Sequence, residues 1–351
     1  MTDITTLLQD TVRSAASSAT ALQIVGSGSK TFYGRSTQGQ ALQLNTHCGI
    51  VDYQPSELVI TARAGTPLVE IEAALAEHNQ MLGFEPPHYG PTASIGGTIA
   101  CGLSGPARPF RGAARDFVLG TKLINGAGES LSFGGEVMKN VAGYDVSRLM
   151  CGAYGTLGVL LEISLKVLPR PASELTLALE CGSETAFARM SEWQRAPLPL
   201  SGLCYDGTQL HVRLSGAGQA VSAAQRRLGG EVDADGEMFW ADLREQRAAF
   251  FDAPGDLWRL SVPATTPASA INGTQLIEWG GALHWLKTTQ DAASIFATTD
   301  TASGHAIRWR GADAAPLFQP LPAPLLALHR RLKQAFDPRG IFNPGRLYPE
   351  L

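Results

Sequence analysis

The chain has 351 residues, of which 44% are hydrophobic and 17% charged, and its 28 lysines and arginines against 32 aspartates and glutamates give a formal net charge of −4. This charge excludes the global basic field with which proteins attract nucleic acid, and the hydrophobic content excludes a disordered chain. We therefore expect a globular protein without a nucleic-acid partner, long enough for two domains of ordinary size or for one large domain with an insertion.

The N-terminal segment predicts an amphipathic helix. A secretory signal combines a basic start with a continuous apolar stretch, and residues 1–20 have neither. At helical spacing Ile4, Leu7, Leu8 and Val12 lie on one side. We expect this side to pack against the rest of the fold.

The segment "IVGSGSKTFYG", residues 24–34, predicts a loop able to hold phosphate. A nucleoside-triphosphate loop ending at Lys30 would need glycine in place of Ile24 and Ser29. A dinucleotide fingerprint would need a third glycine in place of Thr31. Both familiar motifs are excluded. Glycine freedom and hydroxyl donors still suit phosphate, but a plain surface turn explains the same residues, so both interpretations stay open.

Two strands and a helix surround this loop in the sequence. We predict strands over "LQIVG" (22–26) and "ELVITARAG" (57–65). A helix then opens at Thr66 with Pro67 at its first position. The predicted buried side of that helix carries Leu68, Ile71 and Leu75.

A second glycine-rich loop follows, "PPHYGPTASIGGTIACGLSG", at residues 86–105. It has too little side chain to fill a core by itself, so we expect another group to lie against it. Gly96 and Gly97 would let backbone amides approach a pyrophosphate closely. The alternative is a glycine-rich helix start packed on a sheet.

The predicted sheet continues with a hairpin over residues 117–133, in which two alternating strands surround the turn "NGAG". A last strand covers residues 158–168 and ends at "PRP", residues 169–171. Proline on both sides of Arg170 stops the sheet and indicates a domain boundary.

Beyond this boundary the pattern changes. Amphipathic segments at 184–194 and 220–230 alternate with short strand candidates at 175–180 and 209–216, which predicts a separate α+β domain. The C-terminus closes with a helix and then the turn "NPG" at 343–345. This helix carries Leu325, Leu328, Leu332 and Phe336 at intervals of three or four residues, which is helical spacing.

The five cysteines are odd in number and have no paired spacing for zinc, an iron–sulfur cluster or a disulfide framework. No segment approaches the roughly 18 apolar residues that span a bilayer. We therefore predict a cytoplasmic protein without a metal, which would touch a membrane only through partners. The cysteines are Cys48, Cys101, Cys151, Cys181 and Cys204.

Six segments match one family in order and spacing: "GSGS" (26–29), "AGT" (64–66), "ASIGGTIA" (93–100), "RDFVLG" (115–120), "VAGYDVSRL" (141–149) and "GTLGVLLEISLKVLP" (155–169). Through them the first 170 residues resemble the FAD-binding domain shared by vanillyl-alcohol oxidase and p-cresol methylhydroxylase. "DPRGIFNPG" is similar to the usual terminal return of that family. The details "FEPPHYG", "GGEVMKNVAGYD" and "NPGRLY" resemble the FAD-binding subunits of bacterial glycolate oxidase (glycolate dehydrogenase) over essentially the whole chain.

The resemblance implies an α+β fold. A two-subdomain FAD-binding domain of the p-cresol methylhydroxylase type would span residues 1–170, and a smaller α+β cap domain residues 171–324. The C-terminal helix and turn, residues 325–351, would return to the FAD domain.

The resemblance also implies which residues bind FAD. The pyrophosphate would lie between Gly26–Thr31 and Ser94–Thr98, with Asn343 closing over the cofactor. The adenine would lie near Arg115, Asp116 and Val118. For Tyr144 and its neighbour Asp145, capping of a helix is the alternative. The full set implied is Gly26, Ser27, Gly28, Ser29, Lys30, Thr31, Pro87, Ser94, Ile95, Gly96, Gly97, Thr98, Gly102, Gly105, Arg115, Asp116, Val118, Gly143, Tyr144, Gly155, Gly158, Val159 and Asn343.

The chain departs from the family at two places. Some relatives attach FAD through a histidine in the first glycine loop; residues 24–34 contain none, so we predict non-covalent FAD. Relatives that oxidise 2-hydroxy acids carry a metal and carboxylate site resembling "HxGDGNxH". The nearest segment here, "SGHAIRW" at 303–309, has His305 alone, which we interpret as a structural histidine. No catalytic residue is assigned.

Other side chains of the second glycine loop and its continuation have two interpretations. His88 is placed to reach a flavin or to serve packing. Arg108 and Arg111, near Arg115, suit a carboxylate, a phosphate, a partner surface or a solvated loop.

The resemblance implies an FAD-binding subunit of a complex that oxidises glycolate to the 2-oxo acid, with D-lactate as a second candidate substrate. A homologous catalytic FAD subunit and an iron–sulfur subunit would be its partners, and the homologous partner would carry out most substrate oxidation. Two alternatives stay open: a free-standing FAD-dependent oxidoreductase of a small hydroxy acid or alcohol, and a non-catalytic architectural subunit.

Overall fold

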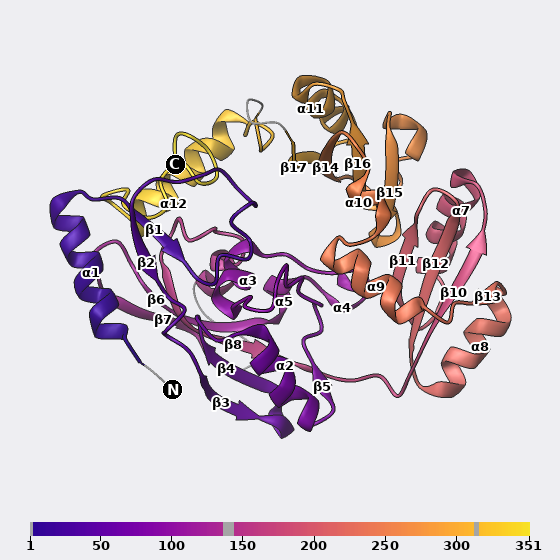
Figure 1. Cartoon of the computed structure of the whole chain (residues 1–351), viewed down its shortest axis with the longest axis horizontal. Coiled ribbons are helices and arrows are strands. Elements are labelled where there is room, and N and C mark those ends of the chain that lie inside the picture. The colour runs from indigo at the N-terminus through magenta and orange to yellow at the C-terminus, as the bar shows by residue number, and fades with distance from the viewer. Residues whose placement is uncertain (1–2, 136–143, 312–315) are drawn as a thin grey trace. The chain divides into compact units, whose positions relative to one another are not determined.

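The computed structural model describes residues 3–135, 144–311 and 316–351 and divides the chain into two compact units. The first unit combines Met1–Ser104, Gly112–Arg170 and Pro320–Leu351, and the second combines Gly105–Arg111 with Pro171–Gln319. In Figure 1 the colour follows the residue number, so the first unit runs from indigo to magenta and ends in yellow. The second unit is pink and orange, apart from the purple segment Gly105–Arg111. Gly105–Arg111 lies with the second unit, although the division expected from the sequence places it in the first.

The first unit is built on a five-stranded antiparallel sheet with the order β3-β4-β8-β6-β7. The predicted hairpin is confirmed, because β6 and β7 pair antiparallel with Thr121 opposite Phe133. The strands are β3 (Ile50–Gln54), β4 (Val59–Arg63), β6 (Val118–Ile124), β7 (Ser130–Gly134) and β8 (Val159–Lys166). A further short pair joins β5 (Gln80–Met81) to β9 (Leu168–Pro169).

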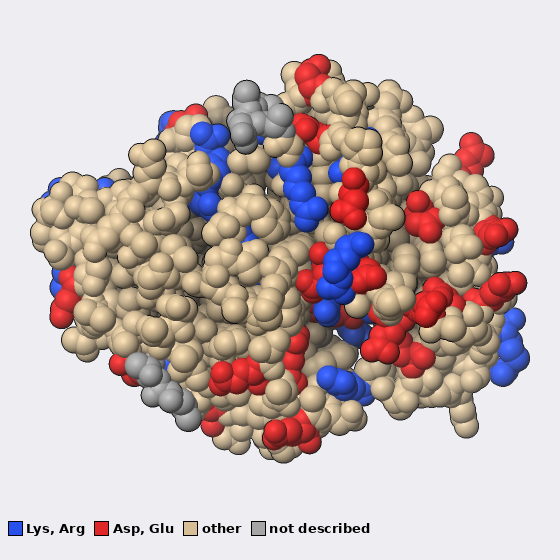
Figure 2. Space-filling model, viewed as in Figure 1, with Lys and Arg blue, Asp and Glu red and all other residues tan. Residues whose placement is uncertain are grey.

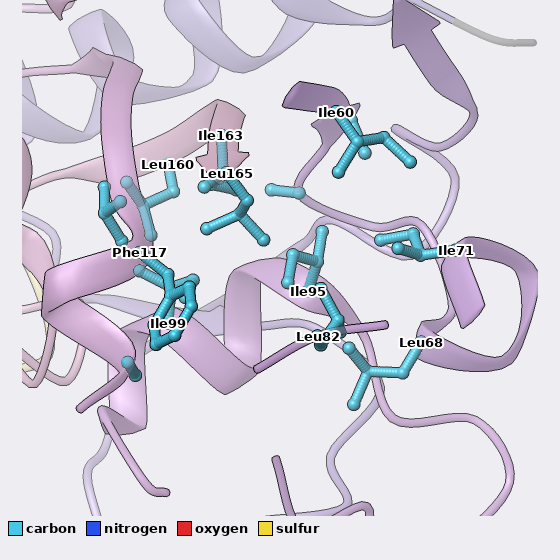
Figure 3. Packing of buried hydrophobic residues seen from close by; sticks show 14 of the residues in the cluster. Ile60, Leu68, Ile71, Leu82, Ile95, Ile99, Phe117, Leu160, Ile163 and Leu165 are labelled. Carbon is cyan, nitrogen blue, oxygen red and sulfur yellow. The ribbon is translucent and has the colours of Figure 1, made fainter. Parts of the chain in front are cut away.

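Helices α2 (Leu68–Glu77) and α3 (Ile95–Cys101) cover this sheet, together with short α5 (Ala114–Phe117) and α6 (Val146–Met150). In Figure 3, Leu68 and Ile71 of α2 and Ile95 and Ile99 of α3 lie beside Ile60, Leu82, Phe117, Leu160, Ile163 and Leu165. The predicted burial of Leu68, Ile71 and Leu75 is confirmed. The predicted start of α2 is wrong: the helix begins at Leu68, because Pro67 still has extended backbone with ψ 140°.

A second layer of the first unit packs around the parallel pair β1 (Leu22–Val25) and β2 (Gln40–Gln43). Helix α1 (Thr5–Ser18) buries Leu8, Val12 and Ala15 in this layer. Leu7 is 63% exposed, so its predicted burial is wrong. The core here accepts only the narrow side of α1 that Leu8 and Val12 define.

The C-terminal helix α12 (Ala323–Phe336) returns to the first unit and leads back beside β1, where Phe342 bridges Leu22 (Figure 1). It is held by a buried charged pair, Lys333 and Asp337, with Nζ and Oδ2 2.8 Å apart. Leu332 and Phe336 pack on the core, whereas Leu325 and Leu328 are 41% and 44% exposed.

The second unit contains an eight-stranded antiparallel sheet with the order β13-β10-β12-β11-β15-β16-β14-β17. The predicted strands and helices of this region are confirmed as β10, β12, α7 and α8, and the sequence analysis missed the other strands. The strands are β10 (Ser173–Glu180), β11 (Leu200–Tyr205), β12 (Gln209–Gly216), β13 (Glu231–Val232), β14 (Asp256–Ser261), β15 (Thr274–Glu278), β16 (Leu283–Thr288) and β17 (His305–Arg310). The helices are α4 (Arg108–Arg111), α7 (Ser183–Gln194), α8 (Gly218–Leu228), α9 (Gly236–Glu245), α10 (Ala249–Asp252) and α11 (Ala292–Thr301).

Candidate cofactor site

The first glycine loop begins where β1 ends, at Val25. Gly28 has a φ of +78°, and the Thr31 N–H turns back to donate to its carbonyl at 3.2 Å. In the described part of the chain, the backbone N–H groups of Ser27, Gly28 and Ser29 have no hydrogen-bond acceptor. Since backbone N–H groups in folded proteins are nearly always paired, three consecutive unpaired donors suit an anionic ligand.

The second glycine loop leads into α3 and packs closely against the first. The Ser94 hydroxyl caps α3 by accepting from the Gly97 N–H at 3.4 Å. A Cβ on Gly26 would lie 2.7 Å from Ser94 Oγ, and one on Gly96 would lie 2.6 Å from the Cβ of Ala64. The segment is thus a glycine-rich helix start packed on a sheet, and glycine is also what brings the two loops together.

Two adjoining cavities lie beside these loops, with volumes of about 620 Å³ and about 510 Å³. Both are lined by Ile24, Gly26, Gly97, Ala100, Tyr154 and Asn343, so they form one continuous cleft within the first unit. The first cavity is further lined by Gln23, Val25, Ser27, Gly28, Ser29, Lys30, Thr31, Thr37, Cys101 and Arg346. The second is further lined by Leu44, Ala64, Gly96, Met150, Ala153, Gly155, Gly158 and Leu160.

The first cavity is electropositive. Lys30 and Arg346 line it, and no aspartate or glutamate is among the described residues of either lining. The Lys30 ammonium donates to the carbonyl of His88 at 3.1 Å and to Ser29 Oγ at 3.4 Å. Elsewhere, on the face in Figure 2, acidic and basic side chains are interspersed. A positive cavity on a mildly acidic protein indicates a site for an anion.

The second cavity is mainly apolar, with Leu44, Met150 and Leu160 in its lining. An apolar cavity joined to one lined by cations and unpaired N–H groups suits a ligand with an aromatic part and a phosphate part. The residues therefore fit FAD, whose pyrophosphate would lie in the first cavity.

Asn343 joins the two walls of the cleft. Its Oδ1 accepts from the Ile24 N–H at 2.9 Å, and its Nδ2 donates to the Tyr154 carbonyl at 2.7 Å. Its φ of +40° allows this geometry at the turn. The side-chain amide is therefore engaged with backbone on both sides and positions the cleft, while its contact with a cofactor stays a prediction.

The structure brings about half of the residues predicted from the sequence into the cleft lining. These are Gly26, Ser27, Gly28, Ser29, Lys30, Thr31, Gly96, Gly97, Gly155, Gly158 and Asn343. Ser94, Ile95 and Thr98 lie in or at the start of α3, and the buried Thr98 Oγ1 has no hydrogen-bond partner among the residues that the structure describes. Gly143 lies outside the described residues.

The remaining predicted residues are not in either lining. The side chains of Ile95, Val118 and Val159 are buried in hydrophobic clusters, so only their backbone is available to a ligand. Tyr144 is 96% exposed, and Asp116 Oδ2 accepts from the Ala113 N–H at 2.8 Å. The others are Pro87, Gly102, Gly105 and Arg115, of which Gly105 belongs to the second unit.

The sequence analysis missed several lining residues. Ala100 and Cys101 follow the "SIGG" motif by one helical turn, which is a signal that helical spacing carries. No helical spacing relates Tyr154 or Arg346 to the glycine loops. Both residues are far from the first loop in the sequence, and only the tertiary structure brings them to it. Burial raises the pKa of Cys101 to about 11, so its thiol stays protonated at neutral pH and is no ready nucleophile.

The side chains with two interpretations are now placed. His88 Nε2 lies 3.1 Å from Glu72 Oε1, and Arg111 Nη2 lies 3.8 Å from Glu174 Oε2. The Arg108 guanidinium lies over the Trp279 ring, 4.3 Å from its centroid. His305 begins β17 in the second unit and is exposed.

The "GYD" motif supports the capping interpretation, since Asp145 Oδ1 accepts from the Arg148 N–H at 3.0 Å at the start of α6. Across residues 3–135, 144–311 and 316–351, no group of three or more histidines, cysteines or acids is arranged to hold a metal ion. None of the helices in these ranges has the length and apolar composition needed to cross a bilayer.

Known proteins share this architecture. Residues 5–134 match the family model described as FAD binding domain, and residues 317–347 match FAD linked oxidases, C-terminal domain. The fold of alkyldihydroxyacetonephosphate synthase superposes with a TM-score of 0.69 at 14% identity, covering 96% of this chain and 74% of that one. The α+β FAD-binding fold expected from the sequence is confirmed.

Three curated relatives resemble the sequence itself. The glycolate oxidase subunit GlcE of Escherichia coli (strain K12) is 55% identical over 349 residues, which is 99% of both chains. The glycolate oxidase subunit GlcD of Bacillus subtilis (strain 168) is 31% identical over 40% of this chain and 30% of its own. D-2-hydroxyglutarate dehydrogenase of Xanthomonas citri pv. viticola is 34% identical over 37% of this chain and 28% of its own.

Proposed function

The chain belongs to the family of the glycolate oxidase subunit GlcE, and from this we propose that its cleft binds FAD as part of an assembly that oxidises glycolate. FAD is the cofactor, and FAD-linked oxidation of a hydroxy acid is the activity to which the chain contributes. Because the relative is a subunit, the chain works with partner subunits.

One observation supports this position for the cofactor. Among the described residues, three consecutive N–H groups without an acceptor and two cations line a cavity that has no carboxylate in its lining. Ser27, Gly28 and Ser29 would donate to the pyrophosphate, and Lys30 would supply charge. When bound, FAD supplies the redox chemistry of its isoalloxazine ring. The chain binds and orients the cofactor, and the apolar second cavity excludes water from its aromatic part.

We propose non-covalent binding. The loop of residues 24–34 contains neither histidine nor cysteine, and Cys101, which lines the first cavity, is held as a protonated thiol. The cofactor should therefore leave the protein on denaturation.

We further propose that the partners are a homologous catalytic flavin subunit and an iron–sulfur subunit, and that the flavin partner oxidises most of the substrate. The sequence supports this division, since its seven histidines include no pair at metal-ligand spacing. D-lactate as a second substrate and a cytoplasmic location at the inner membrane stay predictions. A free-standing enzyme would instead turn over glycolate alone with an artificial electron acceptor.

The test is the visible absorption spectrum of the full-length chain purified alone, before and after acid precipitation. We expect flavin bands that move into the supernatant. A colourless protein that stays colourless with added FAD would overturn the proposed site, and flavin retained in the precipitate would overturn non-covalent binding.

A matched pair of variants locates the site. Lys30→Gln removes a cation from the cleft lining and should weaken FAD binding by about tenfold or more. Lys122→Gln removes the same charge from the same unit at a side chain paired with Glu162 at 3.4 Å, and should leave binding unchanged. Equal effects would show that the charge acts at long range rather than in the cleft.

A further inference from the structure

The C-terminal turn holds the first glycine loop at both of its ends. Before the loop, the Asn343 N–H donates to the Leu22 carbonyl at 3.0 Å, and Asn343 Oδ1 accepts from the Ile24 N–H at 2.9 Å. The Arg346 N–H donates to the Asn343 carbonyl at 3.1 Å and closes a turn. Because Arg346 lies in the same turn as Asn343, its side chain reaches the other end of the loop.

Beyond the loop, the Arg346 guanidinium donates to the carbonyls of three alternate residues. Its Nη2 lies 3.1 Å from Thr31 O and 2.7 Å from Tyr33 O, and its Nη1 lies 2.7 Å from Arg35 O. The Arg35 N–H returns a hydrogen bond to the Arg346 carbonyl at 2.9 Å. Two side chains three positions apart therefore fix the entry and the exit of the loop whose N–H groups are unpaired.

Gly34 makes room for this contact. A Cβ at that position would lie 2.9 Å from Arg346 Nε and 3.3 Å from its Cζ, and Gly34 has a φ of +101°. The guanidinium thus occupies the space that a side chain on the segment after the loop would take. Its planar fork matches the spacing of the carbonyls, which a lysine ammonium would not reproduce.

Among the described residues, no carboxylate forms an ion pair with Arg346 and balances its charge. The guanidinium donates to backbone carbonyls instead. Burial lowers the pKa of Arg346, so the surroundings disfavour its charge. Arg346 is half-buried and lines the first cavity beside Lys30. A cation withdrawn from water is normally paired with an anion, so an anionic ligand in this cavity would supply the missing partner.

We propose that Arg346 is a phosphate-positioning residue: it fixes the exit of the glycine loop and supplies the charge that selects a diphosphate-bearing flavin over an uncharged one. The inference rests on the proposed FAD site. Arg346 acts on the loop through Thr31, Tyr33 and Arg35, and its charge completes the cavity that Lys30 begins. The C-terminal turn is therefore part of the cofactor site rather than only the end of the chain.

The experiment compares two flavins on the full-length apo chain. FAD carries the pyrophosphate and riboflavin carries no phosphate, and flavin fluorescence gives both dissociation constants. The variants are Arg346→Gln, which removes the charge, and Arg346→Lys, which keeps the charge but loses the fork. Arg339→Gln, an exposed arginine near the same turn, is the matched control.

We expect Arg346→Gln to weaken FAD binding by about ten- to a hundredfold, Arg346→Lys to lie between it and wild type, and Arg339→Gln to match wild type. Riboflavin should bind all four proteins alike. The slope of log Kd against log salt for FAD should also become shallower in Arg346→Gln, because one screened charge is lost.

Three outcomes would overturn the inference: equal losses for FAD and riboflavin, which indicate a merely structural role; unchanged FAD binding in Arg346→Gln; or an unchanged salt slope. Circular dichroism identifies a variant that fails to fold. If Arg346→Gln fails, the affinities of Arg346→Lys decide: weaker FAD binding with unchanged riboflavin binding supports the inference, and equal losses for both flavins overturn it. Wild-type protein that binds no FAD would refute the proposed site itself, which separates that failure from this one.

Discussion

Polar groups in the second unit and in the cleft of the first unit differ in whether they have hydrogen-bond partners within the protein. In the second unit the indole of Trp285 donates to Glu278 at 2.6 Å, that of Trp309 to Gln246 at 2.8 Å and that of Trp240 to Thr176 at 3.0 Å. In the cleft, by contrast, the backbone N–H groups of Ser27, Gly28 and Ser29 have no acceptor among the described residues. Polar groups that pair with one another hold a fold, and N–H groups left without an acceptor are available to a ligand.

The two units can also be followed separately in solution. All six tryptophans, from Trp193 to Trp309, belong to the second unit. Tryptophan fluorescence therefore reports unfolding of the second unit, whereas far-ultraviolet circular dichroism reports both units.

The largest effect is expected at the buried pair below the C-terminal turn. Lys333 Nζ donates to Asp337, to Thr156 O and to Phe342 O at 2.6–2.8 Å. Lys333→Met leaves a buried carboxylate unpaired and should lower the free energy of unfolding of the first unit by about 3–5 kcal/mol. The midpoint followed by circular dichroism should fall while the tryptophan transition stays in place.

Lys333→Met with Asp337→Asn is the control, since it removes both charges and keeps a similar shape. It should recover part of the loss. A double variant as unstable as the single one would show that packing, rather than the unpaired charge, causes the effect.

A smaller effect is expected where the glycine loops meet the sheet. Gly96→Ala places a Cβ 2.6 Å from the Ala64 Cβ and 2.8 Å from its carbonyl, so it should cost about 1–3 kcal/mol of stability and weaken FAD binding as well. Gly218→Ala, in open space at the start of α8, is the control and should change neither. Normal FAD affinity in Gly96→Ala would argue against close contact between these loops and the cofactor.

Acid should destabilise the second unit through His284. This side chain is fully buried, its Nε2 donates to Gly281 O at 3.1 Å, and burial lowers its pKa from 6.5 to about 4. The unfolded chain therefore binds a proton that the folded chain does not, and stability present above pH 6.5 is lost as the pH falls toward 4.

Between pH 6.5 and pH 5 the loss of unfolding free energy should be about 1.6 kcal/mol, measured by denaturant unfolding with tryptophan fluorescence. His284→Gln should flatten this dependence. If the variant keeps the full slope, another group in the second unit carries the proton linkage.

The smallest effect is expected at His305. His305 is exposed at the start of β17 and does not line the cleft. We therefore expect His305→Ala to change the dissociation constant of FAD by no more than about twofold. The measurement is the same flavin titration. A tenfold loss of FAD affinity in His305→Ala would show that the second unit also contributes to cofactor binding.

Local patterns predicted the elements that bury one clear side. Leu68, Ile71 and Leu75 repeat at helical spacing and are buried, and the hairpin around "NGAG" has the pairing that alternation indicates. The same reasoning failed for Leu7, which has the right spacing but faces no neighbour. Periodicity shows which residues share a face, whereas burial depends on what the fold places against that face.

Two features of the site belong to the sequence by itself: glycines at the positions where the loops approach one another, and the ordered segments that identify an FAD-binding chain. Only the tertiary structure decided that Asn343 and Arg346 hold the loop, across sequence separations of 319 and 311 residues. Neither contact has a local pattern. They exist because the buried pair Lys333–Asp337 and the Leu22–Phe342 bridge return the C-terminus to β1, and a contact that depends on such a return cannot be read from spacing.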